Sequence, residues 1–161
     1  MKQIPFAALT LAAAIIAPSG HAFDTIAEHA VILDYESDVV LYAKDAMEPM
    51  VPASMTKIMT VYMIFERLKD GRLKETDTFT VSERAWREGG WASGGSTMGL
   101  AIGQEVSIRD LIRGIIVQSG NNACIVAAEG ISGTEEAFAE EMTTRAQELG
   151  LKTASFKNST G

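Results

Sequence analysis

The strongest constraint on the fold is a helical segment from Ser54 to about Lys69 that is apolar on nearly every side. The apolar residues that follow Lys57 are Ile58, Met59, Val61, Tyr62, Met63, Ile64 and Phe65. A helix that is apolar all round is stable in water only when other elements surround it. The segment therefore predicts a central, buried helix. With 161 residues, 47% of them hydrophobic, the chain has the material for about one domain with such a core.

Ser54 and Lys57 stand at the start of this helix, in the run Ser-Met-Thr-Lys. Residues three apart are neighbours on a helix, so Ser54 Oγ and Lys57 Nζ can meet. The start of a helix also offers free N–H groups and a positive dipole end, where an oxyanion is stabilised. A lysine in apolar surroundings needs a partner or loses its charge, and a neutral lysine is the base that a serine nucleophile requires. A serine cap with a lysine that reaches out to water explains the same motif without chemistry.

A second polar motif, Ser119-Gly120-Asn121, follows a predicted helix over 107–118. Ser107 and Asp110 form a start that resembles a capping box. Gly120 breaks the helix, so the side chains on either side of it can point into one cleft. A glycine and asparagine cap that leads into the next helix is the structural alternative, and the motif alone leaves both open.

The rest of the chain predicts a mixture of strands and helices, hence an α+β fold. Two apolar runs, Ala30–Tyr35 and Val39–Tyr42, are typical of an antiparallel hairpin with a turn at Glu36-Ser37-Asp38. The other predicted elements are a strand over 78–81, a brief helix capped by Ser82 that runs to Trp86, a glycine-rich surface loop over 89–96, and helices over about 122–129 and 134–149. In the helix after Ser107, the predicted core face is Ile108, Leu111, Ile112, Ile115 and Ile116.

Composition excludes several classes of function. The net charge is -7, from 14 Lys and Arg against 21 Asp and Glu, which argues against a nucleic-acid partner. One cysteine, Cys124, rules out an internal disulfide framework, and we expect it to be a small buried apolar side chain. With His21 and His29 as the only histidines, we expect no metal site.

Residues 1–22 are predicted to be a signal peptide. Lys2 supplies a positive start, the stretch from Ile4 to Ala17 is mostly apolar, and Gly20-His21-Ala22 offers small residues where a signal peptidase reads them. We therefore expect cleavage after Ala22 and export of residues 23–161. An uncleaved membrane anchor is the alternative, although the apolar stretch is short for spanning a bilayer.

Together the two motifs, in this order, resemble those of the penicillin-recognising serine acyltransferases, which carry Ser-x-x-Lys, then Ser-x-Asn, then Lys-Thr-Gly. The longer runs Pro52–Thr60 and Leu111–Ala123 resemble the D-alanyl-D-alanine carboxypeptidases of peptidase family S11, the low-molecular-mass penicillin-binding proteins. The resemblance implies a DD-peptidase/β-lactamase-like fold, in which an antiparallel sheet lies beside a helical subdomain with the active site between them. Residues 23–161 would be the amino-terminal part of that catalytic domain.

The resemblance also implies residue roles and partners. Ser54 would attack the carbonyl between the terminal D-alanines of a peptidoglycan stem peptide, Lys57 would take its proton, and Ser119 would relay a proton to the leaving D-alanine. Asn121 would bind the substrate, and Ser96 would line the mouth of the cleft. β-Lactam antibiotics would acylate the same serine. No cofactor is implied, and the expected location is the periplasm or the outer face of the cytoplasmic membrane.

The chain departs from the family pattern in its third motif. Lys-Thr-Gly is missing, and Ser159-Thr160-Gly161 lacks the lysine. We therefore expect a domain truncated before the later sheet strands, with any membrane association through a carboxy-terminal anchor outside this chain. Two alternatives remain. A class A β-lactamase typically has Ser-Asp-Asn and a Glu-x-x-x-Asn segment, whereas this chain has Gly120 in the first and lacks the second. A non-catalytic, cell-wall-binding remnant is the other.

Overall fold

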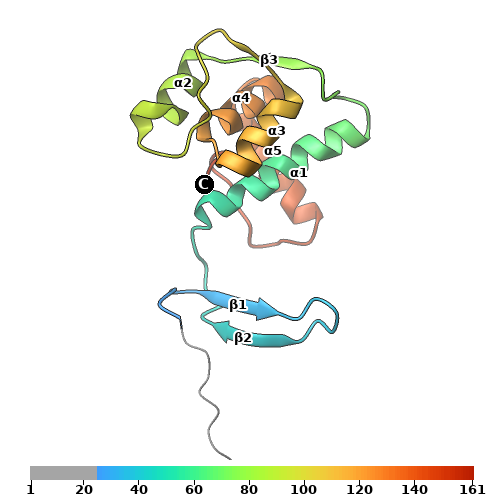
Figure 1. Ribbon diagram of the computed structural model, residues 1–161. Helices are drawn as coiled ribbons and strands as arrows, with labels where there is room; N and C mark the ends of the chain where they lie inside the picture. Colours follow the sequence, from blue (N-terminus) through green and yellow to red (C-terminus); the bar gives the residue numbers. More distant parts are fainter. Residues whose placement is uncertain (1–24) are drawn as a thin grey trace, which may run out of the picture. The chain divides into compact units, whose positions relative to one another are not determined.

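The computed structural model describes residues 25–161 (Figure 1), so the predicted signal peptide at 1–22 lies outside the described residues. The elements in chain order are β1 (Ala30–Leu33), β2 (Val40–Lys44), the 3-10 turn η1 (Ala53–Met55), α1 (Thr56–Lys69), β3 (Thr78–Thr80), α2 (Glu83–Gly89), the 3-10 turn η2 (Trp91–Ser93), β4 (Glu105–Ser107), α3 (Ile108–Gln118), α4 (Asn121–Ser132) and α5 (Glu135–Glu148). The chain divides into two compact units, Met1–Met50 and Val51–Gly161. Within the described part of the chain, no helix is long and apolar enough to cross a membrane.

The described part of the first unit is the predicted antiparallel hairpin. β1 pairs with β2 from Ala30 opposite Lys44 to Leu33 opposite Val40, with an irregularity in register between Ile32 and Leu33. In the turn, the Asp34 carboxylate accepts hydrogen bonds from the Ser37 N–H at 2.8 Å and the Ser37 hydroxyl at 2.6 Å, which lowers the pKa of Asp34. Asp38 takes a left-handed φ of 55°, which Asp tolerates better than most residues because its short side chain bonds locally.

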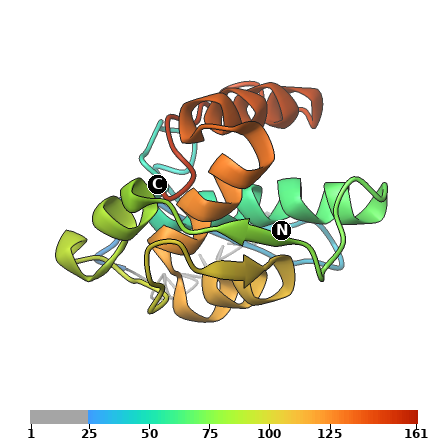
Figure 2. The ribbon, with the colours of Figure 1, turned by 90° about the horizontal axis from the view of Figure 1, so that it is seen from above.

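The second unit is built around α4. Its residues from Asn122 to Ala128 are all buried, and Figure 2 shows this helix between α3 and α5. One hydrophobic cluster joins α4 to α1, α3 and the β3–β4 pair, through side chains that include Ile64, Leu111 and Val126. A second cluster joins α1 to α5 through Met59, Met63, Phe138 and Met142. The helix that begins beside Ser54 therefore packs on three helices.

Serine and threonine side chains start three of the helices. Ser82 accepts from Ala85 N at the start of α2, Ser107 accepts from Asp110 N at the start of α3, and Thr134 accepts from Ala137 N at the start of α5. These caps satisfy N–H groups that the helix itself leaves unpaired. The expected starts after Ser82 and Ser107 are confirmed.

The α+β class is confirmed, and several details differ from the expectation. The short strand β4 was not predicted, because three residues carry too little periodicity; it pairs with β3 from Thr78 opposite Ser107 to Thr80 opposite Glu105. The predicted core face of α3 was wrong at Ile116, which is 60% exposed. The central helix was expected to be buried all round, but Ile58 is 73% and Phe65 48% exposed.

Candidate active site

Ser54 lies on the 3-10 turn that leads into α1, not on the α-helix itself. The residue before it, Ala53, has a left-handed φ of 47°, which most non-glycine residues avoid. The N–H of Met55 closes the turn on the carbonyl of Pro52 at 3.1 Å. The Ser54 side chain is exposed, so its hydroxyl is open to a substrate.

Lys57 occupies the first turn of α1 and is buried, with 5% of its surface exposed. Its Nζ lies within hydrogen-bond distance of Ser54 Oγ, at 2.9 Å, as the three-residue spacing predicted. Among residues 25–161, no carboxylate forms an ion pair with Lys57. The lysine therefore contacts the serine hydroxyl. It does not extend into water, as the alternative of a serine cap with an exposed lysine required.

Ser119 lies at the carboxyl end of α3. Its φ of 54° is left-handed, and this ends the helix and turns the chain toward α4. The Ser119 hydroxyl donates to Ser54 Oγ at 3.4 Å, across 65 residues of sequence. The structure thus brings Ser54, Lys57 and Ser119 together from two separate motifs.

These three side chains help to line a groove of about 460 Å³ between α1 and α3. The remaining lining is apolar: Ile58, Val61, Tyr62, Phe65, Ile115 and Ile116. The exposed residues that departed from the expected core, Ile58, Phe65 and Ile116, are therefore walls of this groove. Apolar walls beside the Ser54 hydroxyl make electrostatic interactions there stronger than in bulk water.

Asn121 and Ser96 adjoin each other, but neither is among the residues that line this groove. The N–H of Asn121, the first residue of α4, donates to the carbonyl of Ser96 at 2.8 Å. A Cβ at Gly95 would lie 2.6 Å from Asn121 Nδ2, so the glycine loop passes directly over the asparagine. Within the described residues, the Asn121 side chain forms no hydrogen bond to Lys57.

Sequence reasoning missed Asn122, which holds this loop in place. Its Nδ2 donates to the carbonyl of Met98 at 2.6 Å, and its Oδ1 accepts from the Met98 N–H at 2.9 Å. Because Asn122 is fully buried, these bonds satisfy polar atoms that would otherwise be costly to bury. The only signal in the sequence was a second asparagine after Asn121.

Cys124 is buried, as expected, and burial raises the pKa of its thiol to about 12. The thiol is therefore neutral around pH 7 and chemically quiet. Among residues 25–161, no group of three or more His, Cys, Asp or Glu side chains is arranged to hold a metal ion.

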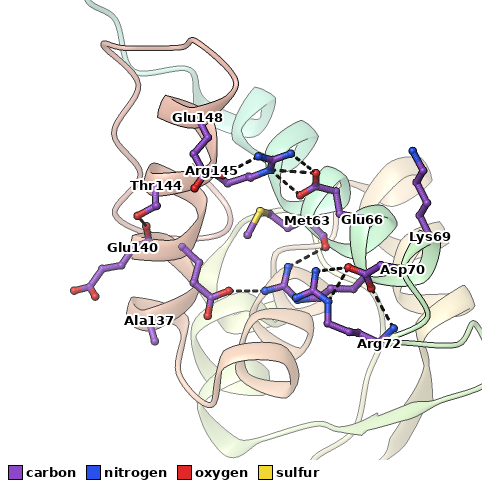
Figure 3. Close-up of a pocket in the computed structure, with 12 residues that line it drawn as sticks. Met63, Glu66, Lys69, Asp70, Arg72, Ala137, Glu140, Thr144, Arg145 and Glu148 are labelled. Carbon is purple, nitrogen blue, oxygen red and sulfur yellow. Dashed lines mark hydrogen bonds and ion pairs between the residues drawn. The ribbon is translucent and has the colours of Figure 1, made fainter.

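A larger hollow, of about 900 Å³, lies elsewhere, between α1 and α5 (Figure 3). Charged side chains line it and pair with one another: Arg145 with Glu66 and Glu148, and Arg67 with Glu141. The hydrogen bonds from Arg145 lower the pKa of Glu66. Since its arginines already have carboxylate partners, we assign this hollow to the packing of α5 on α1 and keep the smaller groove as the candidate active site.

Comparison with known proteins gives a consistent family match. The model of the family described as D-alanyl-D-alanine carboxypeptidase, Peptidase_S11, matches residues 16–161. The D-alanyl-D-alanine carboxypeptidase DacF of Bacillus subtilis is 44% identical over 135 residues, which are 84% of this chain and 33% of the relative. DacC of Escherichia coli is 43% identical over 128 residues, which are 79% of this chain and 32% of the relative.

Solved structures agree with the sequence relatives. Penicillin binding protein 5 from Haemophilus influenzae superimposes with a TM-score of 0.77 at 39% identity, over 84% of this chain and 39% of that one. The D-alanyl-D-alanine carboxypeptidase DacD from Francisella tularensis gives a TM-score of 0.77 at 35% identity, over 96% of this chain and 35% of that one. This chain thus spans about a third of the length of the relatives that it matches.

Proposed function

Because the chain belongs to the D-alanyl-D-alanine carboxypeptidase family, we propose that it carries the nucleophile and proton-transfer groups of a serine-type carboxypeptidase. The substrate is a peptidoglycan stem peptide that ends in D-Ala-D-Ala, and β-lactam antibiotics acylate the same serine. The predicted family resemblance is confirmed. The family match favours this function over the β-lactamase alternative.

The observation that supports this function most strongly is the convergence on Ser54 Oγ. Lys57 Nζ lies 2.9 Å from this oxygen and Ser119 Oγ lies 3.4 Å from it. A nucleophile within hydrogen-bond reach of its base, with a third group on the same atom, is the arrangement that activated serines require. A cell-wall-binding remnant needs neither the buried lysine nor this geometry.

The proposed reaction proceeds through a covalent acyl-enzyme on Ser54. Neutral Lys57 takes the Ser54 hydroxyl proton while Oγ bonds to the carbonyl carbon between the two D-alanines, and the carbonyl electron pair moves onto oxygen. When that pair returns, the C–N bond breaks and the D-alanine amine leaves with the proton that Lys57 took from Ser54, relayed through Ser119. Water then attacks the ester, which releases the shortened peptide and restores the Ser54 hydroxyl. The Ser54 N–H, at the start of the helix, supplies one donor to the oxyanion.

Asn121 and Ser96 are proposed as substrate-binding residues because Asn121 follows Ser119 by two residues and is bonded to Ser96. Their backbone bond at 2.8 Å ties the glycine loop to the start of α4, so a peptide bound there would contact both elements. We further propose that residues 1–22 direct export and that the protein acts in the periplasm or on the outer face of the cytoplasmic membrane, where peptidoglycan is found.

The test is covalent labelling of the full-length protein with a fluorescent penicillin. We expect a stoichiometric adduct that survives denaturation and maps to Ser54 by peptide mass spectrometry. Ser54→Ala should abolish the adduct, while Ser37→Ala, at an exposed serine of the hairpin turn, should label like the parent. No adduct with the parent protein, or an adduct on another residue, would refute the proposed function.

Ser119→Ala is expected to slow hydrolysis of a D-Ala-D-Ala peptide more than acylation by penicillin. The reason is the leaving group: peptide cleavage must protonate a departing amine, whereas a β-lactam nitrogen stays tethered after its ring opens. Loss of one proton-transfer group typically costs about 10²–10⁴-fold in rate, so the peptide reaction should fall within that range. The two rates are compared by D-alanine release and by fluorescent labelling. Equal losses in both would contradict the relay role.

A further inference from the structure

The backbone immediately before Ser54 is strained. Ala53 has a φ of 47°, where the Cβ of an L-residue crowds its own backbone. Such a conformation persists only where the surrounding structure holds it. Since Ser54 follows directly, the direction of its side chain toward Lys57 and Ser119 depends on whatever holds Ala53.

Gly161 lies against this strained residue. A Cβ built on Gly161 would be 1.9 Å from the Ala53 carbonyl oxygen and 2.4 Å from its carbonyl carbon. No side chain larger than a hydrogen fits between the two backbones. Gly161 itself has a φ of 92°, a conformation that glycine adopts readily. The backbone of Gly161 therefore abuts the peptide unit that precedes the nucleophile.

A compact turn, Asn158–Gly161, sets the position of Gly161. The Asn158 side-chain Oδ1 accepts from Gly161 N at 2.6 Å and from Thr160 N at 3.0 Å. Ser159, inside the turn, is fully buried, and its carbonyl accepts from Thr60 Oγ1 at 2.7 Å. Thr60 belongs to α1, the same helix that carries Lys57. This hydrogen bond therefore ties the turn to α1.

A buried carboxylate fixes the other side of the turn. Glu135 is 5% exposed, and its Oε1 accepts from Ser159 N at 2.9 Å and from Ser159 Oγ at 2.6 Å. Its Oε2 accepts from Arg84 of α2 at 3.1 Å, so the charge of the carboxylate is paired. Hydrogen bonds to an ionised group are stronger than those between neutral groups. The turn is therefore held from α1, α2 and α5 together.

We propose that the turn Asn158–Gly161 braces the backbone of Ala53 and thereby positions Ser54 for acylation, with Thr60, Glu135, Ser159 and Gly161 as positioning residues. The inference rests on the proposed function of Ser54 and adds the residues that position its side chain. These residues touch no substrate; they act through the Ala53 peptide unit. Ser159-Thr160-Gly161 lacks the lysine of a third catalytic motif. Its role in this proposal is to brace the residue that precedes Ser54.

The main test removes one fastening without changing side-chain shape. In the full-length protein, Thr60→Val deletes the hydroxyl that holds the Ser159 carbonyl, and Thr60→Ser keeps it. The matched control is Thr143→Val, because Thr143 Oγ1 accepts from Phe156 N at 2.9 Å and so holds the same segment farther from Ala53. For each variant, the second-order acylation rate constant with fluorescent penicillin is measured well below its Tm.

Thr60→Val should lower this rate constant by about tenfold, since small displacements of a reacting group cost at least that much. Thr60→Ser should keep the rate constant near the parent value. Thr143→Val should lower the Tm but leave the acylation rate constant near the parent value. Equal slowing by Thr60→Val and Thr143→Val at equal loss of Tm would mean a general structural effect and overturn the proposal. So would a parent-like rate for Thr60→Val.

A second pair of variants addresses the strain itself. Gly161→Ala places a methyl group on the Ala53 carbonyl and should slow acylation at least as much as Thr60→Val. Ala53→Gly removes the strain, because glycine adopts a left-handed φ without a brace. In the Ala53→Gly background, Thr60→Val should therefore cost a much smaller factor than in the parent. The same factor in both backgrounds would refute the bracing of Ala53.

Failure of the brace is distinguishable from failure of the proposed function. If the parent protein is not labelled by penicillin, the carboxypeptidase proposal fails, and the backbone NMR chemical shifts of Ala53 then decide the brace. They should move away from left-handed values in Thr60→Val and Gly161→Ala but not in Thr143→Val. Unchanged Ala53 shifts in all three variants would overturn it.

Discussion

Replacing Lys57 with alanine is expected to lower the rate of acylation of Ser54 by penicillin and by peptide by about 10²–10⁴-fold, the usual cost of losing one positioned base. Lys57 is 5% exposed, donates to Ser54 Oγ at 2.9 Å and has no carboxylate partner among the described residues. The fold should survive, because an alanine suits the apolar surroundings of that position. The measurement is the second-order acylation rate constant, with circular dichroism to show that the variant is folded.

The control is Lys69→Ala, which removes an exposed lysine at the other end of the same helix. It should acylate at the parent rate. If Lys57 served only to place a charge, its removal would destabilise the protein and leave Ser54 reactive. A folded Lys57→Ala protein that acylates within about tenfold of the parent would therefore contradict the role of base.

The largest expected effect on stability comes from Phe138→Ala. Phe138 has the largest fully buried side chain in the cluster that joins α5 to α1. Deleting a buried Phe side chain typically costs about 3–5 kcal/mol, from lost burial and the cavity left behind. Against a total stability of about 5–15 kcal/mol for a typical domain, such a loss brings this unit close to unfolding. The free energy of unfolding is measured by urea titration of the full-length protein.

Phe65→Ala is the matched control, because it makes the same deletion on α1 at a side chain that is 48% exposed. Its cost should be clearly smaller, since less surface is taken from contact with protein. Equal losses at the two positions would mean that the α1–α5 cluster does not carry the stability of this unit.

The sequence was most informative where the signal is local. The apolar run after Lys57 predicted a helix to Lys69, and α1 ends there. The polar starts at Ser82 and Ser107 were correct because a cap acts within three residues. The spacing of Ser54 and Lys57 likewise predicted their contact, because one helical turn brings such residues together.

The features that the sequence did not reveal depend on contacts between distant segments. Nothing near Ala53 in the chain indicates a left-handed residue, because the glycine against it is Gly161. The role of Asn122 depends on Met98, which belongs to a loop with no periodic pattern. Ile116 follows the helical spacing of its neighbours and still lies exposed, because it lines the open groove between α1 and α3.

The same long-range contacts determine the order in which parts of the candidate site form during folding. Ser54 is 65 residues from Ser119, and Thr60 is 99 residues from Ser159. Contacts that close such long loops form late, because the entropy of closure is lost before the contact is gained. A nascent chain grows from its amino terminus, so Ser54 and Lys57 exist well before Ser119 and Gly161. Ser54 thus meets Lys57 early and Ser119 last, and the first appearance of penicillin labelling in pulse-labelled chains would time the completion of folding of this unit.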